Sequence, residues 1–303
     1  MEELNLNAGR RVFMRAGFAM MAMVAMTVAL QTVGYRIFVR QLDNEWVRYT
    51  LAIVPQYVIA MPLAALLMYQ TPALPIAQKK LKAGQFMIIV MICFTIMYAG
   101  NLTGSIINFI IQLFAQSNMA ILIQELISGS SIWANLLFVV LLAPVAEELF
   151  FRRLLIKKLL AYGEKPAVIV SGLAFGLIHG NLTQFFYAFG LGLAFGYIFV
   201  KTGKVIYTIV LHMIINFFGS IISVWVLNAN LIVTGLYGLV LIGLVIAGIV
   251  LFFVNKKRIV MNAGLFAVPK GRGAVFLNAG MILFYIVSAA LFAVNTYSML
   301  TET

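Results

Sequence analysis

Long apolar runs, separated by short polar or basic segments, recur along the whole chain. A run of about 20 apolar residues is long enough to cross the hydrocarbon core of a bilayer as a helix. The runs are continuous rather than alternating, so they do not predict the strands of a transmembrane barrel. The pattern predicts membrane spans at residues 16–35, 49–69, from 86 onward, 132–158, 166–181, 182–200, 205–226, 231–254 and 274–294.

The predicted fold is therefore all-α, a polytopic bundle of about eight or nine transmembrane helices. The number depends on residues 101–131, where a polar break at Asn101 precedes an apolar piece, 106–114, that either continues the third span or re-enters the membrane. Residues 116–131 are predicted to form a loop because they contain a Ser-Gly-Ser-Ser turn signal. No repeat, linker or low-complexity tract divides the chain, which predicts a single integral membrane domain of residues 1–303.

Composition and charge agree with a membrane protein. The chain is 63% hydrophobic and 10% charged, and its net charge is +12. The basic residues lie in short clusters between apolar runs, a pattern typical of cytoplasmic loops rather than of a nucleic-acid-binding face. With the N-terminus in the cytoplasm, all but three of the 21 Lys and Arg residues fall on the cytoplasmic side. The positive-inside rule thus predicts a cytoplasmic N-terminus, and nine spans would put the C-terminus outside.

Two adjacent carboxylates, Glu147 and Glu148, lie inside the fourth apolar run. An ionised group in hydrocarbon costs at least about 2.5 kcal/mol, so such residues usually face the interior of the bundle and serve a function there. Glu148 and Arg152 are four residues apart and can pair across one helical turn. Glu147 points about 100° away, so we expect it to be unpaired and free to react.

The two histidines of the chain, His179 and His212, both lie in apolar runs that follow the Glu pair. Phe175 precedes His179 by one turn, and Asn216 follows His212 by one turn, so His212 and Asn216 can present two donors to one spot. At about 1.5 Å of rise per residue, both histidines and Glu147 fall roughly 12–20 Å from the predicted cytoplasmic edge. Each residue alone could serve helix packing, but their concentration favours a functional site that opens to the cytoplasm.

Residue types narrow the chemistry that such a site could perform. A pair of catalytic aspartates is excluded because the chain has a single aspartate, Asp43, in a predicted loop. Neither a His-Glu-x-x-His zinc sequence nor a Gly-x-Ser-x-Gly nucleophile elbow occurs. Water activated by a carboxylate, with histidine and asparagine donors for an oxyanion, remains the best fit and is suited to peptide hydrolysis.

These motifs resemble the CAAX protease and bacteriocin-processing family, also called the abortive-infection (ABI) family. It includes type II CAAX prenyl endopeptidases and lysostaphin-resistance-like proteins. The resemblance covers residues 132–226, the family-like catalytic core, and is carried by Glu147-Glu148-x-x-x-Arg152, Phe175-x-x-x-His179 and His212-x-x-x-Asn216.

The resemblance implies a role for each motif residue. Glu147 would be the general base, His179 would help to activate or orient the water, and His212 with Asn216 would stabilise the oxyanion. Glu148, Arg152 and Phe175 would support the site. The family is often described as metalloproteases, so a divalent ion such as zinc held by Glu147, His179 and His212 stays open beside a metal-free site.

We therefore expect an intramembrane endopeptidase, in a bacterial plasma membrane, that hydrolyses a peptide bond of a membrane-anchored or leader-bearing protein. Its partners would be a peptide or membrane-protein substrate and the lipid bilayer, with no nucleic acid. Two alternatives remain: a non-proteolytic scaffold or bacteriocin-immunity protein on the same fold, and a proton-coupled transporter. The transporter predicts an inverted repeat that the sequence does not show.

Overall fold

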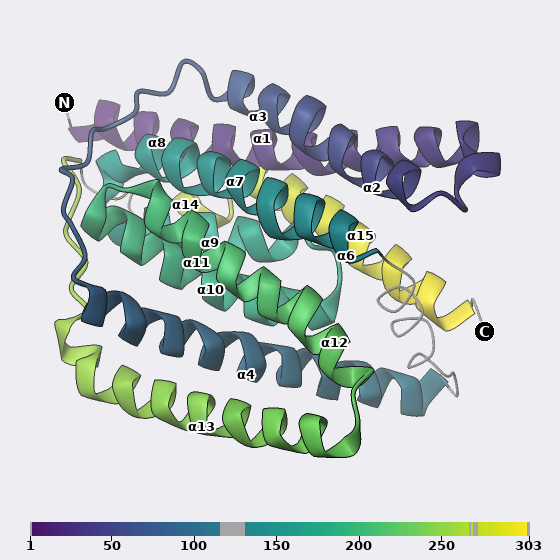
Figure 1. Ribbon diagram of the computed structural model, residues 1–303. Helices are drawn as coiled ribbons and strands as arrows, with labels where there is room; N and C mark the ends of the chain where they lie inside the picture. The colour runs from purple at the N-terminus through teal and green to yellow at the C-terminus, as the bar shows by residue number, and fades with distance from the viewer. Residues whose placement is uncertain (1, 116–130, 267, 269–271, 302–303) are drawn as a thin grey trace.

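The computed structural model describes residues 2–115, 131–266, 268 and 272–301, and within these residues it contains helices and no strand (Figure 1). Eight helices are long and apolar enough to cross a membrane, which confirms the predicted all-α polytopic bundle of eight or nine spans. They are Gly9–Ile37, Glu45–Leu67, Ala83–Phe114, Ile132–Tyr162, Leu182–Thr202, Val205–Leu227, Leu231–Arg258 and Ala279–Thr301.

Three of the spans consist of α-helical pieces joined by π-helical turns. The second span is built from α2 (Glu45–Ile53), η2 (Val54–Ala60) and α3 (Met61–Leu67). Its prolines, Pro55 and Pro62, stand near the starts of η2 and α3, where a missing backbone N–H favours a wider turn. The fourth span consists of α6 (Ile132–Ala134), η3 (Asn135–Leu142), α7 (Ala143–Glu148), η4 (Leu149–Ile156), α8 (Lys157–Leu159) and η5 (Leu160–Tyr162). The sixth span consists of α11 (Val205–Phe217), η6 (Phe218–Ile222) and α12 (Ser223–Leu227).

The third span is one unbroken helix, α4 (Ala83–Ala115), so the expected polar break at Asn101 does not interrupt it. Gly104 shows why a small residue stands in this helix: a Cβ there would lie 2.6 Å from the backbone of Thr183. Asn108 Nδ2 donates to Thr183 Oγ1 over 2.6 Å, so the polar face of α4 is used for helix packing. The predicted loop at residues 116–131 lies, except for Ser131, outside the described residues.

The expected fifth span is shorter than predicted. Helix α9 (Glu164–Leu177) has 14 residues, about 21 Å of rise, which is too short to cross the bilayer alone. It ends in a tight turn where Gly180 has φ +67° and Asn181 caps α10 (Leu182–Thr202). His179 therefore stands at the inner end of a short helix, in a turn held to α15 (Ala279–Thr301) by the 3.0 Å hydrogen bond from Asn295 to Gly180 O.

The buried core connects the first and last helices with the fourth span and α9. Its fully buried aromatic residues include Phe13 of α1 (Glu2–Ile37), Phe151 of η4, Phe175 of α9 and Phe284 of α15. By contrast α13 (Leu231–Asn255) lies beside α4 at the periphery, and most of its side chains are exposed (Figure 1). The site described below thus sits in the part of the bundle with the densest packing.

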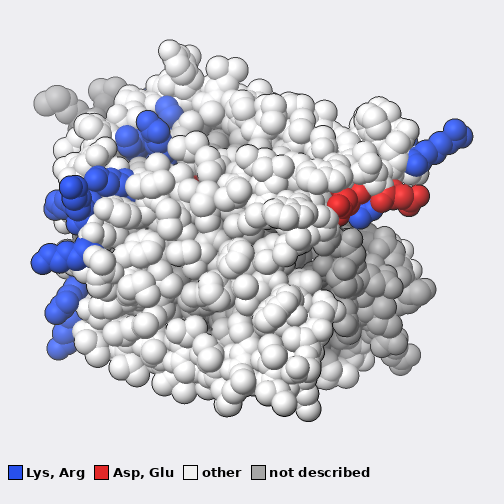
Figure 2. All heavy atoms as spheres, in the orientation of Figure 1, with Lys and Arg blue, Asp and Glu red and all other residues white. Residues whose placement is uncertain are grey.

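The two ends of the bundle differ in charge. Figure 2 shows most of the visible Lys and Arg at the end where the chain begins, whereas the opposite end carries acidic residues beside a smaller basic group. The N- and C-termini lie at opposite ends of the bundle (Figure 1), because short α9 reverses the direction of the chain between the fourth span and α10 without being a full span. The cytoplasmic placement of the basic end stays a prediction of the positive-inside rule.

Close packing of α9 against α10 depends on glycine, which gives a first prediction. A Cβ at Gly192 would lie 2.8 Å from Gly172 Cα and 3.1 Å from its carbonyl oxygen, so the two helices would have to separate. We expect Gly192→Ala to lower the free energy of unfolding by about 1–3 kcal/mol, the usual cost of overpacking. Gly243→Ala, in α13 with open space around its Cβ, is the control. Equal thermal stability of the two variants in detergent would contradict this packing.

Candidate active site

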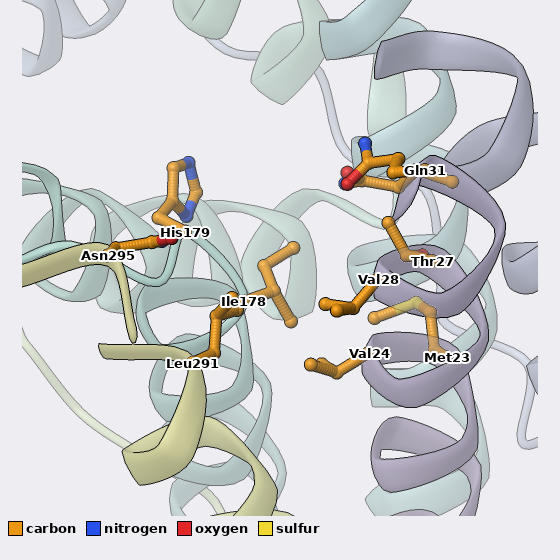
Figure 3. Close-up of a pocket in the computed structure, with 10 residues that line it drawn as sticks. Met23, Val24, Thr27, Val28, Gln31, Ile178, His179, Leu291 and Asn295 are labelled. Carbon is orange, nitrogen blue, oxygen red and sulfur yellow. The ribbon is translucent and has the colours of Figure 1, made fainter. Parts of the chain in front are cut away.

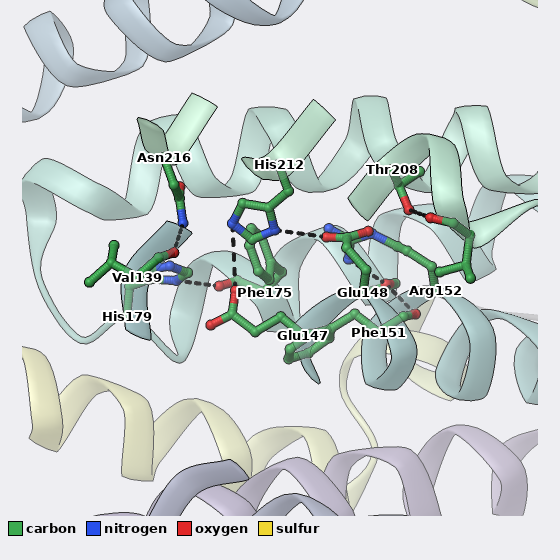
Figure 4. Close-up of polar contacts among 12 residues, drawn as sticks. Val139, Glu147, Glu148, Phe151, Arg152, Phe175, His179, Thr208, His212 and Asn216 are labelled. Atoms are coloured by element: carbon green, nitrogen blue, oxygen red, sulfur yellow. Dashed lines mark hydrogen bonds and ion pairs between the residues drawn. The ribbon is translucent and has the colours of Figure 1, made fainter. Parts of the chain in front are cut away.

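The fourth span carries the Glu pair at the end of α7, and the following turn, η4, carries Arg152. Arg152 Nε lies 3.0 Å from Glu148 Oε2, and both side chains are fully buried, so the predicted pair forms (Figure 4). Ser171 of α9 lies 3.3 Å from the guanidinium and itself donates to Phe151 O. The guanidinium also stacks 4.7 Å from the centre of the Phe175 ring. This charge pair is therefore fixed on several sides inside the bundle.

His212 of α11 connects the two carboxylates. Its Nδ1 lies 3.2 Å from Glu148 Oε1, and its Nε2 lies 3.7 Å from Glu147 Oε2. A proton on Nδ1 lets the ring donate to Glu148, which leaves Nε2 turned toward Glu147 (Figure 4). The residues from Arg152 through Glu148 and His212 to Glu147 thus form one connected polar chain.

Glu147 has a partner, contrary to the expectation that it is unpaired. The Tyr57 hydroxyl, from η2 of the second span, donates to Glu147 Oε1 over 2.5 Å. The sequence motifs do not predict Tyr57, because they lie in residues 132–226 and Tyr57 belongs to the second span. A signal was present: Gln56 and Tyr57 are polar residues between two prolines of an apolar span.

His179 and Phe175 lie one turn apart at the end of α9. Because a carbonyl oxygen can only accept, the 2.7 Å contact between His179 Nδ1 and Phe175 O requires a proton on Nδ1. In the neutral ring Nε2 is then an acceptor. The Phe175 ring meets the His179 ring edge-on at 5.0 Å and the His212 ring at 5.6 Å, so this phenylalanine separates and orients both histidines.

Asn216 is close to the other motif residues, but its amide has a partner of its own. Its Nδ2 donates to Val139 O of η3 over 2.9 Å (Figure 4). One N–H of the amide is therefore occupied, and a second N–H remains. The structure brings Asn216 to the same cavity as His212, with one amide N–H already used by Val139 O.

All four predicted catalytic residues line one cavity of about 340 Å³. The residues around it come from α2 and η2 of the second span, the fourth span, α9 and the turn after it, α10 and α11. They include two polar groups not anticipated from the sequence, Gln184 and Tyr187. The cavity is lined by Tyr49, Ala52, Ile53, Gln56, Tyr57, Phe138, Val139, Ala143, Glu147, Phe175, Ile178, His179, Gln184, Tyr187, Ala188, Leu191, His212 and Asn216.

The cavity extends away from the basic end of the bundle. The predicted opening to the cytoplasm stays a prediction, since the orientation of the bundle rests on the positive-inside rule. Tyr49 and Gln184, which line it, lie within the first turns of α2 and α10 at the other end. Toward the basic end, the site is closed by Phe151, Arg152 and Phe195, whose side chains are fully buried. Apolar packing and a neutralised charge pair thus block the direct route to that face.

This direction of access can be tested by thiol labelling. In a protein with the buried Cys93 replaced by alanine, we expect Gln184→Cys to react with a membrane-impermeant reagent added to the face opposite the basic loops. Lys80→Cys, exposed at the basic end, is the control and should react from the other face. Labelling of both cysteines only from one and the same face would contradict the cavity's direction.

Glu147, His179 and His212, the candidate metal ligands, are not arranged as a coordination site in this structure. Among the described residues no group of three or more His, Cys, Asp or Glu side chains could hold a metal ion. The Nδ1 atoms of the two histidines contact Phe175 O and Glu148 Oε1, so only the Nε2 atom of each ring could approach an ion. No step below is routed through a metal.

A comparison with known protein families finds a match within this chain. Residues 129–218 match the model of type II CAAX prenyl endopeptidase Rce1-like proteins. These residues form an Rce1-like domain. They include Glu147, His179, His212 and Asn216 but neither Tyr57 nor the helices at the two ends of the chain.

The Rce1-like domain accounts for somewhat less than a third of the chain. No curated protein and no solved structure matches the chain. The matched model is that of type II CAAX prenyl endopeptidases, so these residues are similar to those of an endopeptidase family. The eight helices that are long and apolar enough to cross a membrane indicate an integral membrane protein.

Proposed function

We propose that this protein is an intramembrane endopeptidase that hydrolyses a peptide bond of a membrane-anchored or leader-bearing protein with water activated by Glu147. The observation that carries the proposal is the single cavity lined by Glu147, His179, His212 and Asn216. Peptide hydrolysis needs a base, an aligned water and donors for the oxyanion, and these residue types supply all three. Substrate access through apolar walls suits a membrane-anchored protein.

In the proposed reaction a water molecule lies between Glu147 and the His179 Nε2 acceptor. The water oxygen attacks the scissile carbonyl carbon, and its proton passes to the Glu147 carboxylate. With both ring nitrogens protonated, His212 donates from Nδ1 to Glu148 and from Nε2 to the tetrahedral oxyanion, which also accepts from the free N–H of Asn216. Collapse breaks the carbon–nitrogen bond, and Glu147 returns the proton to the leaving amine.

Glu148 and Arg152 support this reaction without touching the substrate. Glu148 accepts from His212 Nδ1, which fixes the ring with Nε2 toward Glu147. Arg152 neutralises Glu148 inside the bundle, where an unpaired carboxylate would be costly. Tyr57 fixes one oxygen of Glu147 by its 2.5 Å hydrogen bond and leaves the other oxygen to face His212.

The proposal is tested in cells by comparing membrane proteomes. Strains that produce the wild-type protein or Glu147→Gln at equal levels are compared for peptides that end at new termini. We expect one or a few membrane-anchored or leader-bearing proteins to be shortened only with the wild type. Asp43→Asn, the same chemical change on an exposed residue, is the control and should behave as wild type. Identical proteomes with all three proteins would support a non-proteolytic scaffold instead.

A further inference from the structure

A second cavity of about 260 Å³ lies on the other side of His179 from the catalytic cavity. It is enclosed by α1, α15 and the turn between α9 and α10, with Gln56 of η2 at its edge (Figure 3). Its lining comprises Met23, Val24, Thr27, Val28, Gln31, Gln56, Ile178, His179, Leu291 and Asn295. Helices α1 and α15 lie outside the matched residues 129–218, so of this lining the family match covers only Ile178 and His179.

The two cavities meet at the catalytic residues. Gln56, Ile178 and His179 line both of them. The His179 ring therefore forms part of the boundary between the second cavity and the space beside Glu147. A chain bound in the second cavity is adjacent to the proposed water-activating residue.

The walls of the second cavity combine apolar and hydrogen-bonding groups. Figure 3 shows Thr27 and Gln31 on one side, facing His179 and Asn295 across the open space. Gln31 donates one amide N–H to Ala52 O, and Asn295 donates one to Gly180 O, which leaves a carbonyl oxygen and another N–H on each amide.

Thr27 points to a ligand independently of these amides. Its side chain is 9% exposed, and its hydroxyl oxygen has no hydrogen-bond partner among the described residues. A buried hydroxyl without a partner is unfavourable, and its position in the lining puts it in reach of whatever occupies the cavity.

We infer that the second cavity is a substrate subsite that binds an extended, apolar peptide segment next to the scissile bond. An extended backbone presents alternating N–H and C=O groups, which match side chains that can both donate and accept. Its apolar side chains match Met23, Val24 and Leu291. A prenyl or acyl chain would leave the polar groups of this wall unsatisfied. The inference rests on the proposed peptidase function.

Binding is tested first by photocrosslinking, which needs no cleavage. Benzoylphenylalanine replaces Val28, at the edge of the cavity, in the Glu147→Gln protein, and a mixture of synthetic ten-residue apolar peptides is the probe. The same replacement at Val33, an exposed residue of α1 outside the lining, is the control. We expect peptide adducts at Val28 and at least tenfold fewer at Val33. Adducts at Val28 only with lipid, or with an added isoprenoid alcohol that displaces the peptide, would overturn the assignment.

Kinetics then distinguish failure of the subsite from failure of the peptidase. Val28→Trp fills part of the cavity, and Val33→Trp is its control. For ten-residue substrates we expect Val28→Trp to raise KM at least tenfold, with a much smaller rise for peptides shortened to five residues. Equal KM changes for long and short peptides, with cleavage intact, would refute the subsite alone. Absence of cleavage by the wild type would refute the proposed peptidase function. The crosslinking experiment would then still show whether a peptide binds in the second cavity.

Discussion

Replacement of Arg152 by alanine is expected to lower the free energy of unfolding by about 3–5 kcal/mol, since it leaves a buried carboxylate without its partner. Both Glu148 and Arg152 are fully buried, and their charged atoms lie 3.0 Å apart. The same change removes the guanidinium from the Phe175 ring and from Ser171, so α9 loses contacts to the fourth span. The measurement is yield and thermal stability in detergent, together with cleavage activity.

The neighbouring arginine provides the matched control. Arg153 is exposed, so Arg153→Ala should keep the yield and melting temperature of the wild type. A fully stable and fully active Arg152→Ala protein would show that the pair does not support the site.

Replacement of His212 by alanine is expected to lower kcat about 10²–10³-fold, the usual effect of removing one oxyanion donor. His212 is the only described side chain that contacts both Glu147 and Glu148, so its loss also releases Glu148 on one side. KM should change little, because the donor acts mainly as charge develops on the oxyanion.

The control for this variant lies on the same helix. Ile206→Ala, an exposed position of α11, should keep both kinetic constants. A His212→Ala protein that folds and retains kcat within a factor of two of wild type would rule out His212 as an oxyanion donor.

Much of the fold could be predicted because apolar length decides whether a helix can span a membrane. The apolar runs predicted every long helix of the described residues, and the one-turn spacing of Glu148 and Arg152 predicted their ion pair. The four-residue spacing of Phe175 and His179 likewise agrees with the contact between their rings at the C-terminal end of α9. These features depend on residues close together in the sequence, so the spacing of residue types along the chain is enough to predict them.

The remaining features depend on contacts between distant segments. The tight turn at Gly180 ends α9 early because Asn295, far along the chain, holds its carbonyl oxygen. Tyr57 reaches Glu147 across 90 positions of sequence, and no spacing rule connects them. The direction of the cavity depends on which side chains fill the space around Arg152. That packing cannot be predicted from the hydropathy of the sequence.

The most direct test of the central claim is peptide cleavage by the purified, detergent-solubilised protein. Wild type, Glu147→Gln and Asp43→Asn would be compared on a substrate found in the proteome comparison, with and without a chelator. The account predicts that wild type and Asp43→Asn cleave equally, that chelator leaves both rates unchanged, and that Glu147→Gln is slower by at least about 10³-fold. Cleavage by Glu147→Gln at the wild-type rate would contradict water activation by this carboxylate. Loss of wild-type cleavage on chelation, restored by one added ion, would contradict the metal-free route.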